Sequence, residues 1–523
     1  MKQSTTKPHR LVRTTRYERF LPSTPHRVKG GSLTKISSIV VLVILGAMSN
    51  AISQIIPIKT VPLATGSQFS IFPSANTASG GLSIAVEDEL SDPFTNPAKG
   101  FSMNGMRVLS APQMYSVSIQ RGTSEGSGIS LPLGVLTKHG DFFGGLYWAR
   151  QQLSSKRNSA FGITPASSGS LTGMTDDPEN NTYTFAMLGT TIPGTEIAVG
   201  ASALWGDLNS VEGVNLLFPR SPKVLQNGTL THYRIGVMRT MESDRQFDAV
   251  IVRSIFKMRY DVASVGTTGI GQTTTVQFNP EYDQTNLWGL QIRYTHALED
   301  HWRVGALLTT NWKEHPKIPN YDLMSIPRDP GNSTAYNLGL GLIKRRDHSF
   351  FGADIIYEPI ETATWAEADQ STRLANGDIF PAGMKTVENF FNFSNWIARF
   401  GFRAGSDTSS FQAGFQRHAI NYDLEQINHL QRSKRGQHES WVEWTISGGY
   451  GFSIGPARIL YTVLLTTGTG QPSVVSAGWT GTARSDVSAL DFAGDFLPAP
   501  SGSLNVRNAF VWTHLVSVSY RIE

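Results

Sequence analysis

The chain has 523 residues and no cysteine, which excludes a disulfide scaffold, a thiolate metal site and a cysteine nucleophile. Charged residues make up only 16% of the chain, a low share for a soluble protein, while aromatic residues reach 10%. Residues 1–35 hold nine Lys and Arg but one acid, so the formal charge falls from +4 to −4 without them. The remainder gives no reason to expect nucleic-acid binding.

An apolar run lies near the N-terminus. Ile36–Ala47 is a twelve-residue, mostly apolar stretch behind the basic region, and small residues follow it from Ser49. This layout predicts a secretory signal peptide, cleaved after Ala51 or Ser53, and makes residues 1–53 a basic extension plus signal peptide. An uncleaved inner-membrane anchor is the alternative. Because no apolar run of about eighteen residues follows, the exported chain could span a membrane only as a barrel.

Residues 54–100 form a region of different character, in which Gly, Ser, Pro and Asn recur. It includes an acidic run, Glu87-Asp88-Glu89, and it ends in a stretch that contains Asn96-Pro97-Ala98. Such residues, without a helical or strand period, predict loops and turns. We interpret residues 54–100 as a plug-like segment that tucks into the lumen of the domain that follows.

Residues 101–523 alternate strand-like segments with connections. We count about sixteen segments, joined in turn by short connections such as Lys138–Asp141 and Glu299-Asp300 and by long ones of about a dozen to forty residues. Tight turns at one end and long loops at the other are typical of bacterial outer-membrane β-barrels. A barrel of about fourteen strands is the alternative, if the first segment, Met114–Arg121, and one other belong to the plug.

The segments alternate with a period of two. Trp288, Leu290 and Ile292 share one face of a segment whose other face carries Gln291 and Arg293, and the next segment repeats this pattern. Many segments alternate over about ten residues, enough to cross a bilayer, whereas strands of soluble proteins average about five or six. The sequence therefore predicts an all-β fold, a transmembrane antiparallel β-barrel with an apolar outer face and small or polar residues lining an aqueous interior. A soluble all-β protein is the alternative.

Two features of the predicted barrel depart from simple alternation. The segment Phe247–Tyr260 has polar residues on both faces, so its faces cannot be assigned from the pattern. Glycines at alternate strand positions, such as Gly339 and Gly341, are expected to leave room inside the barrel or to allow bending.

Residues 78–100 resemble the N-terminal signature of fatty-acid outer-membrane transporters (FadL-like). They also resemble that of the related PorV-like barrels of the type IX secretion apparatus. The shared features are the Gly-rich stretch Ala78–Gly81, the acidic pair Glu87-Asp88 and Asn96-Pro97-Ala98. Lys99 stands where the family usually has Gly, and the family usually has fewer strands than we count. The resemblance implies that Asn96, Pro97 and Ala98 end a plug, or hatch, and lead into the barrel wall.

Charged residues on the inward faces are the candidate functional residues. The alternation assigns the following side chains to the lumen: Arg234, Arg293, Arg303, Arg399, Arg403, Arg458, Asp354, Glu358 and Glu443. The basic excess could attract an anionic solute or a carboxylate head group. Alternatively, these charges pair with acids of the plug, such as Glu87, or solvate the wall.

No catalytic residue, metal site or cofactor is predicted. Gly122–Gly126 fits the G-x-S-x-G pattern of a nucleophile elbow, but that motif needs a strand-to-helix turn and here it lies in a loop between strands. The twelve His residues are scattered and show no metal-binding spacing, and no Gly-rich phosphate loop is present.

Three functions are compatible with the predicted barrel. In the first, the protein is an outer-membrane channel or transporter for small or hydrophobic solutes, gated by its N-terminal residues. In the second, it is a structural or secretion-partner barrel whose long loops, Glu361–Phe391 and Thr469–Val506, bind another protein. In the third, Ser124 hydrolyses lipids. The first is the preferred hypothesis, with the lipid bilayer as the partner of the wall.

Overall fold

The structure, a computed structural model, describes most of the chain from residue 71 onwards. The described ranges are 71–119, 124–157, 178–211, 223–242, 244–267, 274–298, 301–315, 331–368, 370–374, 377–406, 408–469 and 509–522. The predicted signal peptide and residues 54–70 lie outside them. No helix in these ranges is long and apolar enough to cross a membrane.

The described chain begins with an irregular stretch, residues 71–105, which we call the N-terminal segment. It contains three short helical turns: η1 (Thr77–Ser79), α2 (Asp92–Thr95) and η2 (Pro97–Ser102). Asn96 caps η2, because its side-chain oxygen accepts a hydrogen bond from the amide of Ala98 at 3.1 Å. The predicted plug boundary therefore falls at a helical turn, and the wall begins six residues after Gly100, at Met106.

The rest of the chain forms the strands of one large sheet. Their bounds are β1 (Met106–Ser110), β2 (Gln113–Ile119), β3 (Ser124–His139), β4 (Phe142–Arg157), β5 (Glu179–Thr191), β6 (Ile197–Leu208), β7 (Val224–Met241), β8 (Arg245–Thr267), β9 (Thr274–Ala297), β10 (Trp302–His315), β11 (Gly331–Arg346), β12 (Ser349–Glu367), β15 (Lys385–Gly405), β16 (Ser409–Asn428), β17 (Ser433–Ile454), β18 (Ala457–Thr469) and β19 (Ala509–Ile522). A separate small hairpin is made by β13 (Thr372–Arg373) and β14 (Ile379–Phe380).

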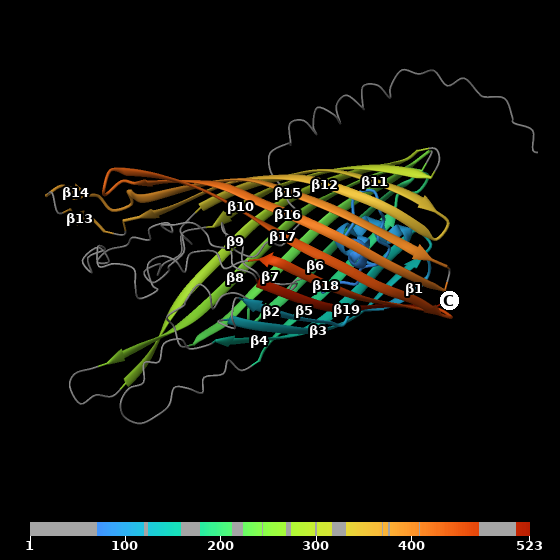
Figure 1. Ribbon diagram of the computed structural model, residues 1–523, viewed down its shortest axis with the longest axis horizontal. Coiled ribbons are helices and arrows are strands. Elements are labelled where there is room, and N and C mark those ends of the chain that lie inside the picture. The colour runs from blue at the N-terminus through green and yellow to red at the C-terminus, as the bar shows by residue number, and fades with distance from the viewer. Residues whose placement is uncertain are drawn as a thin grey trace, which may run out of the picture. The chain divides into compact units, whose positions relative to one another are not determined.

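The sheet closes on itself through its first and last strands. The segments β1 and β2 run in line, separated by Ala111-Pro112, and both pair antiparallel with β19 on one side and β3 on the other. Together they count as one wall strand, so the described residues form a closed antiparallel barrel of sixteen strands (Figure 1). The predicted fold class and the count of sixteen are confirmed. The predicted first strand, Met114–Arg121, is the second half of an interrupted strand that starts at Met106.

The strand ends that the predicted short turns join all lie at one end of the barrel, which we call the short-turn end. Met106 pairs with Ile522, so the wall begins and ends there. These turns need residues with positive φ, and Gly140 and Gly455 supply them at φ 58° and 57°. The connections at the opposite end are less regular than predicted, because only four residues separate β16 from β17.

Nearly half of the predicted long loop Glu361–Phe391 belongs to two wall strands. Strand β12 continues to Glu367 and β15 begins at Lys385, so the connection between them is 368–384. The second predicted loop, Thr469–Val506, lies almost entirely outside the described residues. The hypothesis of a partner-binding barrel therefore loses much of the first of its two proposed surfaces.

The outer face of the wall is apolar. Large side chains point away from the lumen and are more than half exposed on many strands, for example Leu146 67%, Leu188 68%, Ile235 67% and Leu340 64%. Trp and Tyr residues occupy positions near the ends of this apolar belt, including Trp302 next to the short turns and Trp288 further along β9. A lipid bilayer is the environment that such a surface matches.

The inner face is divided into two halves of different chemistry. On β4 to β8 the inward side chains are mostly apolar and buried: Phe143, Tyr147, Tyr183, Phe185, Leu204, Leu208, Leu230, Phe256, Met258 and Tyr260. On β10 to β16 they are mostly polar: Thr309, Asn311, Lys313, Asp354, Glu358, Asn389, Asn395 and Gln412. The expectation of a small or polar interior is therefore wrong for β4 to β8, where the N-terminal segment and the wall pack as a hydrophobic core.

Candidate functional site

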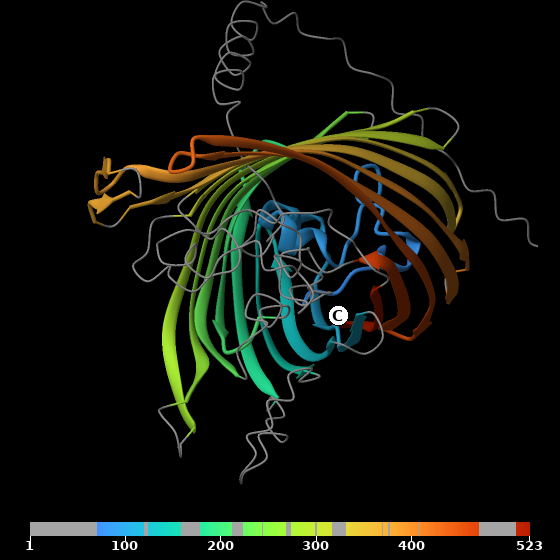
Figure 2. The ribbon, with the colours of Figure 1, turned by 60° about the vertical axis from the view of Figure 1, so that its left-hand side comes forward.

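The N-terminal segment lies inside the barrel, where Figure 2 shows it in blue. Its two halves are tied together by Asp88, which is 5% exposed. The Asp88 carboxylate accepts hydrogen bonds from the amides of Ala75 at 2.8 Å, Asn76 at 3.1 Å and Leu90 at 3.0 Å. It also accepts one from the Ser74 hydroxyl at 2.6 Å. These bonds hold residues 74–76 and 88–91 together without any help from the wall.

One side of the segment packs against the apolar half of the wall. Phe72 and Phe94 stack with their ring centroids 4.3 Å apart. Both rings also contact Tyr147 of β4 and Phe185 of β5, at centroid distances of 5.1 to 5.4 Å. The Tyr147 hydroxyl donates to the carbonyl of Ile71 at 2.8 Å, which satisfies its buried polar end.

The opposite side of the segment is bonded to the far wall at η1. The amide of Gly80 donates to the hydroxyl of Ser447 on β17 at 3.0 Å, and that hydroxyl donates to the carbonyl of Ala78 at 2.9 Å. The Ser79 hydroxyl lies 2.7 Å from the side-chain amide of Gln412 on β16. The segment therefore reaches across the lumen from β4 and β5 to β16 and β17.

Between these two contacts the segment touches β10 to β12 and β15. The carboxylate of Asp354 accepts a hydrogen bond from the amide of Ser83 at 2.8 Å. The next residue, Ile84, packs against Ile356 and Ile397, with Leu307 at the edge of the group. The segment thus meets the wall on several sides and leaves the lumen crossed by protein at this level.

Inward-facing glycines make room for the segment. A Cβ atom added to Gly449 of β17 would lie 2.6 Å from the Cβ of Ala78, and one added to Gly341 of β11 would lie 2.7 Å from the Cβ of Ile84. Similar close approaches to the segment occur at Gly200, Gly236, Gly305, Gly339, Gly401 and Gly414. The prediction that Gly339 and Gly341 leave room inside the barrel is confirmed.

Replacing Gly449 with Val is expected to lower the free energy of unfolding by about 1–3 kcal/mol, the usual cost of overpacking a filled interior. The new side chain would push η1 off the wall. Equilibrium unfolding of the protein in detergent, followed by tryptophan fluorescence, would measure this loss. Gly448→Ala is the matched control, because a Cβ there points outward and meets nothing nearer than the Gln412 carbonyl oxygen at 3.9 Å. An equal loss in both variants would contradict the packing argument.

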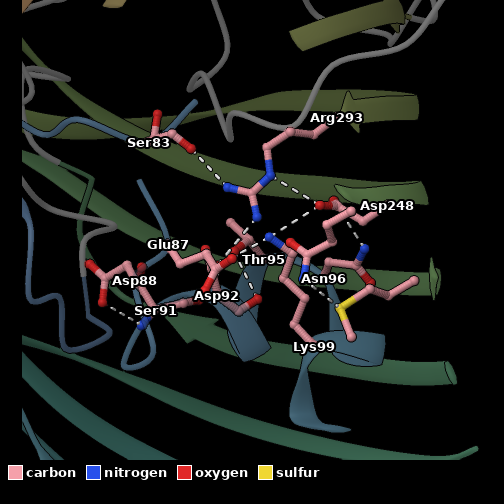
Figure 3. A network of polar contacts seen from close by, with 12 residues as sticks. Ser83, Glu87, Asp88, Ser91, Asp92, Thr95, Asn96, Lys99, Asp248 and Arg293 are labelled. Carbon is pink, nitrogen blue, oxygen red and sulfur yellow. Dashed lines mark hydrogen bonds and ion pairs between the residues drawn. The ribbon is translucent and has the colours of Figure 1, made fainter. Parts of the chain in front are cut away.

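A buried network of charges joins the segment to β8 and β9 (Figure 3). The ammonium of Lys99 lies 3.1 Å from Asp92 and 3.2 Å from Asp248 of β8. Arg293 of β9 lies 3.0 Å from Asp248 and 3.4 Å from Asp92, and also donates to the Ser83 carbonyl at 2.8 Å. Two cations thus face two carboxylates, and the four side chains are between 2% and 17% exposed.

The position of each member of this network follows from its local structure. Asp248 and Arg293 are directly opposite each other in the β8–β9 register, so both point inward side by side. Lys99 lies in η2, whose start is fixed by the Asn96 cap. Burial opposes the charge of Lys99, but the carboxylates of Asp248 and Asp92 outweigh it and raise the pKa of Lys99 above its usual value.

The arginines assigned to the lumen from the sequence all contact the N-terminal segment. Their partners are the carbonyls of Phe94 and Thr95 for Arg234, Asp92 and the Ser83 carbonyl for Arg293, Glu87 for Arg303, the Ser83 hydroxyl for Arg399, the Ala75 carbonyl for Arg403 and Glu89 for Arg458. These contacts favour the interpretation in which the basic residues hold the segment. A role for them in binding a solute stays a prediction.

Of the remaining predicted residues, some contact the N-terminal segment and others contact only the wall. Asp354 bonds to the segment, whereas Glu358 accepts a hydrogen bond from Asn395 at 3.0 Å and Glu443 lies 3.6 Å from His418, both on the wall. Asn96 donates to Asp248 at 3.3 Å. Pro97 and Ala98 are buried and lie close to Gly200 of β6.

Residues that sequence reasoning missed include Lys99, Asp248 and Ser447. Within the described ranges, no three His, Asp or Glu side chains are arranged to hold a metal ion. Ser124 is the first residue of β3, so the G-x-S-x-G match does not lie at a strand-to-helix turn.

The interior of the barrel differs on the two sides of the segment. Toward the short turns, a cavity of about 520 Å³ is lined by Glu89, Arg107, Arg345, Arg403 and Arg458, among others. Toward the other end, the apolar half of the wall continues past the segment through Leu230, Phe256 and Tyr260. Thr309 and Asn311 lie on β10, which is separated from β8 by β9 alone. The hydroxyl of Thr309 and both polar atoms of the Asn311 amide have no hydrogen-bond partner among the described residues.

Comparison with known proteins finds similarity in structure only. The chain matches no family model, and no curated protein sequence matches it. Among solved structures, it is similar to a Pseudomonas aeruginosa FadL homologue, with 11% identity, a TM-score of 0.43, and coverage of 87% of this chain and 99% of that one. It is also similar to the CymD monoaromatic hydrocarbon channel, with 11% identity, a TM-score of 0.36, and coverage of 87% and 98%.

A third similar structure is the P. putida toluene transporter TodX, with 12% identity, a TM-score of 0.33, and coverage of 86% and 98%. FadL-type barrels, which residues 78–100 of this sequence resemble, are thus also among the solved structures to which the chain is similar.

Proposed function

We propose that this protein is a channel for small hydrophobic solutes in the bacterial outer membrane, closed at rest by its N-terminal segment. The observation that carries the proposal is the divided lumen of a closed barrel. An apolar outer belt suits a bilayer, and the apolar inner half formed by β4 to β8 extends beyond the segment. A water-filled porin needs a polar lumen on all sides, so this half suits a solute that avoids water.

The polar half of the lumen adds a preference for a solute with one polar end. Asn311 and Thr309 are buried with unpaired polar atoms among the described residues, and such groups gain most when a ligand supplies the missing hydrogen bonds. They lie on β10, which is separated by β9 alone from β8, the last strand of the apolar half. A solute with an apolar body and a hydrogen-bonding end would satisfy both sides at once.

The proposed channel also has an opening on the periplasmic side of the segment. The cavity of about 520 Å³ lies on the short-turn side of the segment, which corresponds to the periplasm in a bacterial barrel. A solute that passes the segment would enter this polar, largely charged space. Movement or loosening of residues 71–105 is the step that would give a solute access to this cavity.

Uptake into outer-membrane vesicles tests the proposal, because their lipopolysaccharide leaflet resists apolar solutes. Vesicles that contain the protein are expected to take up labelled toluene faster than vesicles without it, while uptake of a labelled sugar stays unchanged. Equal acceleration of both solutes would indicate a general porin instead. No acceleration of toluene or of benzyl alcohol, which adds a polar end, would overturn the proposal.

A further inference from the structure

A row of aromatic side chains crosses the outer face of β6 to β9, well away from the short-turn end. The rings of Trp205 and Tyr233 meet edge to face with centroids 6.5 Å apart. Tyr233 pairs with Arg253 in the β7–β8 register, and Arg253 pairs with Trp288 in the β8–β9 register. The three aromatic side chains are 43% to 48% exposed. Such a row marks the level at which a bilayer changes from acyl chains to headgroups.

The outward face of β7 to β9 becomes more polar directly beyond this row. On the short-turn side of it, the outward residues are apolar and exposed, with Ile235 at 67% and Ile251 at 51%. At the row itself Arg253 lies over the Trp288 ring, with its guanidinium carbon 5.1 Å from the ring centroid. A cation on the outward face beside an interfacial Trp is positioned at the headgroup level rather than in the hydrocarbon.

Two further cations follow Arg253 on the same face of β8. Lys257 is four residues further along, about 13 Å at the usual rise of a strand. Its cross-strand neighbours are the uncharged Thr229 and Gln284. The Lys257 side chain is exposed and has no hydrogen-bond or ion-pair partner in the described part of the chain. It is therefore free to bind an anion.

Arg259 completes this basic ladder, which we define as Arg253, Lys257 and Arg259. Its side chain is 50% exposed and pairs with Asp261 at 2.9 Å. Its guanidinium carbon also lies 5.9 Å from the centroid of the Tyr282 ring. One paired carboxylate against three cations leaves the ladder with an excess of positive charge. With strands tilted by about 40°, the ladder extends about 15 Å along the membrane normal from the aromatic row, through the headgroup layer and just beyond it.

We propose that the basic ladder binds the phosphate groups of a phosphorylated lipid in the outer leaflet. Guanidinium and ammonium groups make charge-assisted hydrogen bonds to phosphate oxygens, and the ladder presents three of them beside the row of rings that fixes the depth of the wall. The acyl chains of the same lipid would lie against Ile251 and Ile235. The proposal rests on the proposed function only because it places the barrel in the outer membrane.

The ladder can be tested on the detergent-solubilised full chain by native mass spectrometry. The probe is bisphosphorylated lipid A, compared with a lipid A that lacks both phosphates. Lys257→Gln/Arg259→Gln is expected to raise the dissociation constant for the bisphosphorylated lipid roughly 25-fold, at about fivefold for each of the two charges removed. Arg253 is kept in this variant, because its contact with Trp288 supports the wall.

Lys344→Gln is the matched control. Lys344 is also outward and exposed, and its ammonium lies 5.0 Å from the Trp302 ring, but at the short-turn end. This variant is expected to bind the bisphosphorylated lipid as the unaltered protein does. Equal affinity of the unaltered protein for the lipid without phosphates would overturn the proposal. So would unchanged binding in the double variant.

A gel separates these outcomes from failure of the proposed function. A folded barrel migrates differently before and after heating, so each variant is checked for heat-modifiable migration before the titration. If the unaltered protein shows no such barrel, the outer-membrane channel itself is contradicted. If the barrel is folded but the double variant binds the lipid as tightly as the unaltered protein does, only the proposal of lipid binding is contradicted.

Discussion

Deleting residues 54–98 is expected to raise the single-channel conductance several-fold in planar bilayers. The reason is geometric, because the N-terminal segment reaches from the Phe72 and Phe94 contacts on β4 and β5 to the Ser447 hydrogen bonds on β17. Its removal takes away the protein that crosses the lumen at this level. The strand pairing that closes the barrel, from Met106 to Ile522, is left in place.

The deletion also removes part of the hydrophobic core, so a second variant is needed that leaves the wall untouched. Asp88→Ala serves this purpose, because the hydrogen bonds of its carboxylate all go to residues 74–76, 90 and 91 of the segment itself. We expect this variant to loosen the segment and to show brief openings of the enlarged conductance. If both variants migrate as folded barrels and conduct as the unaltered protein does, the segment does not close the lumen.

The fold could be predicted wherever one face of a strand meets lipid and the other does not. The segment Trp288–Leu298 follows this rule, and its alternation was sufficient to assign both faces. The rule fails for β8, where Val250, Phe256 and Met258 point inward against other apolar side chains. A strand that mixes apolar and polar residues on both faces carries no period of two, so Phe247–Tyr260 could not be assigned from its sequence.

The same reasoning explains the error at residues 361–391. The end of β12 and the start of β15 lie beyond the apolar belt, and their register continues to Glu367 and Lys385. A strand with water on its outer face no longer needs apolar residues there. The Thr, Ala and Asn residues of this region therefore look like a loop in the sequence, although backbone pairing continues through them.

The candidate site was predictable in its charges but not in its contacts. Alternation assigned the arginines to the lumen, and Glu87 and Glu89 do pair with two of them. Other arginines donate to backbone carbonyls, for example Arg403 to Ala75. A backbone carbonyl acceptor cannot be predicted from residue type, because every residue carries one. Lys99 stood out as a departure from the family pattern, but nothing local to it indicates Asp248, its partner on a distant strand.

Replacing Asp248 with Asn is expected to lower the free energy of unfolding by about 3–5 kcal/mol, the usual cost of removing one partner from a buried ion pair. Asp248 is 2% exposed and lies 3.2 Å from Lys99 and 3.0 Å from Arg293. Without it, two buried cations share the single carboxylate of Asp92. Urea unfolding of the protein in lipid vesicles, followed by tryptophan fluorescence, would measure the loss.

The control for this experiment is a double variant that restores the balance of buried charges. In the double variant Lys99→Met/Asp248→Asn, Arg293 keeps Asp92 at 3.4 Å and the Ser83 carbonyl at 2.8 Å, so one cation again faces one carboxylate. The Asn at 248 can still accept the hydrogen bond from Asn96. We therefore expect the double variant to recover most of the lost stability. If it is less stable than Asp248→Asn alone, packing at Lys99 outweighs charge, and the network does not act as a balanced set of four.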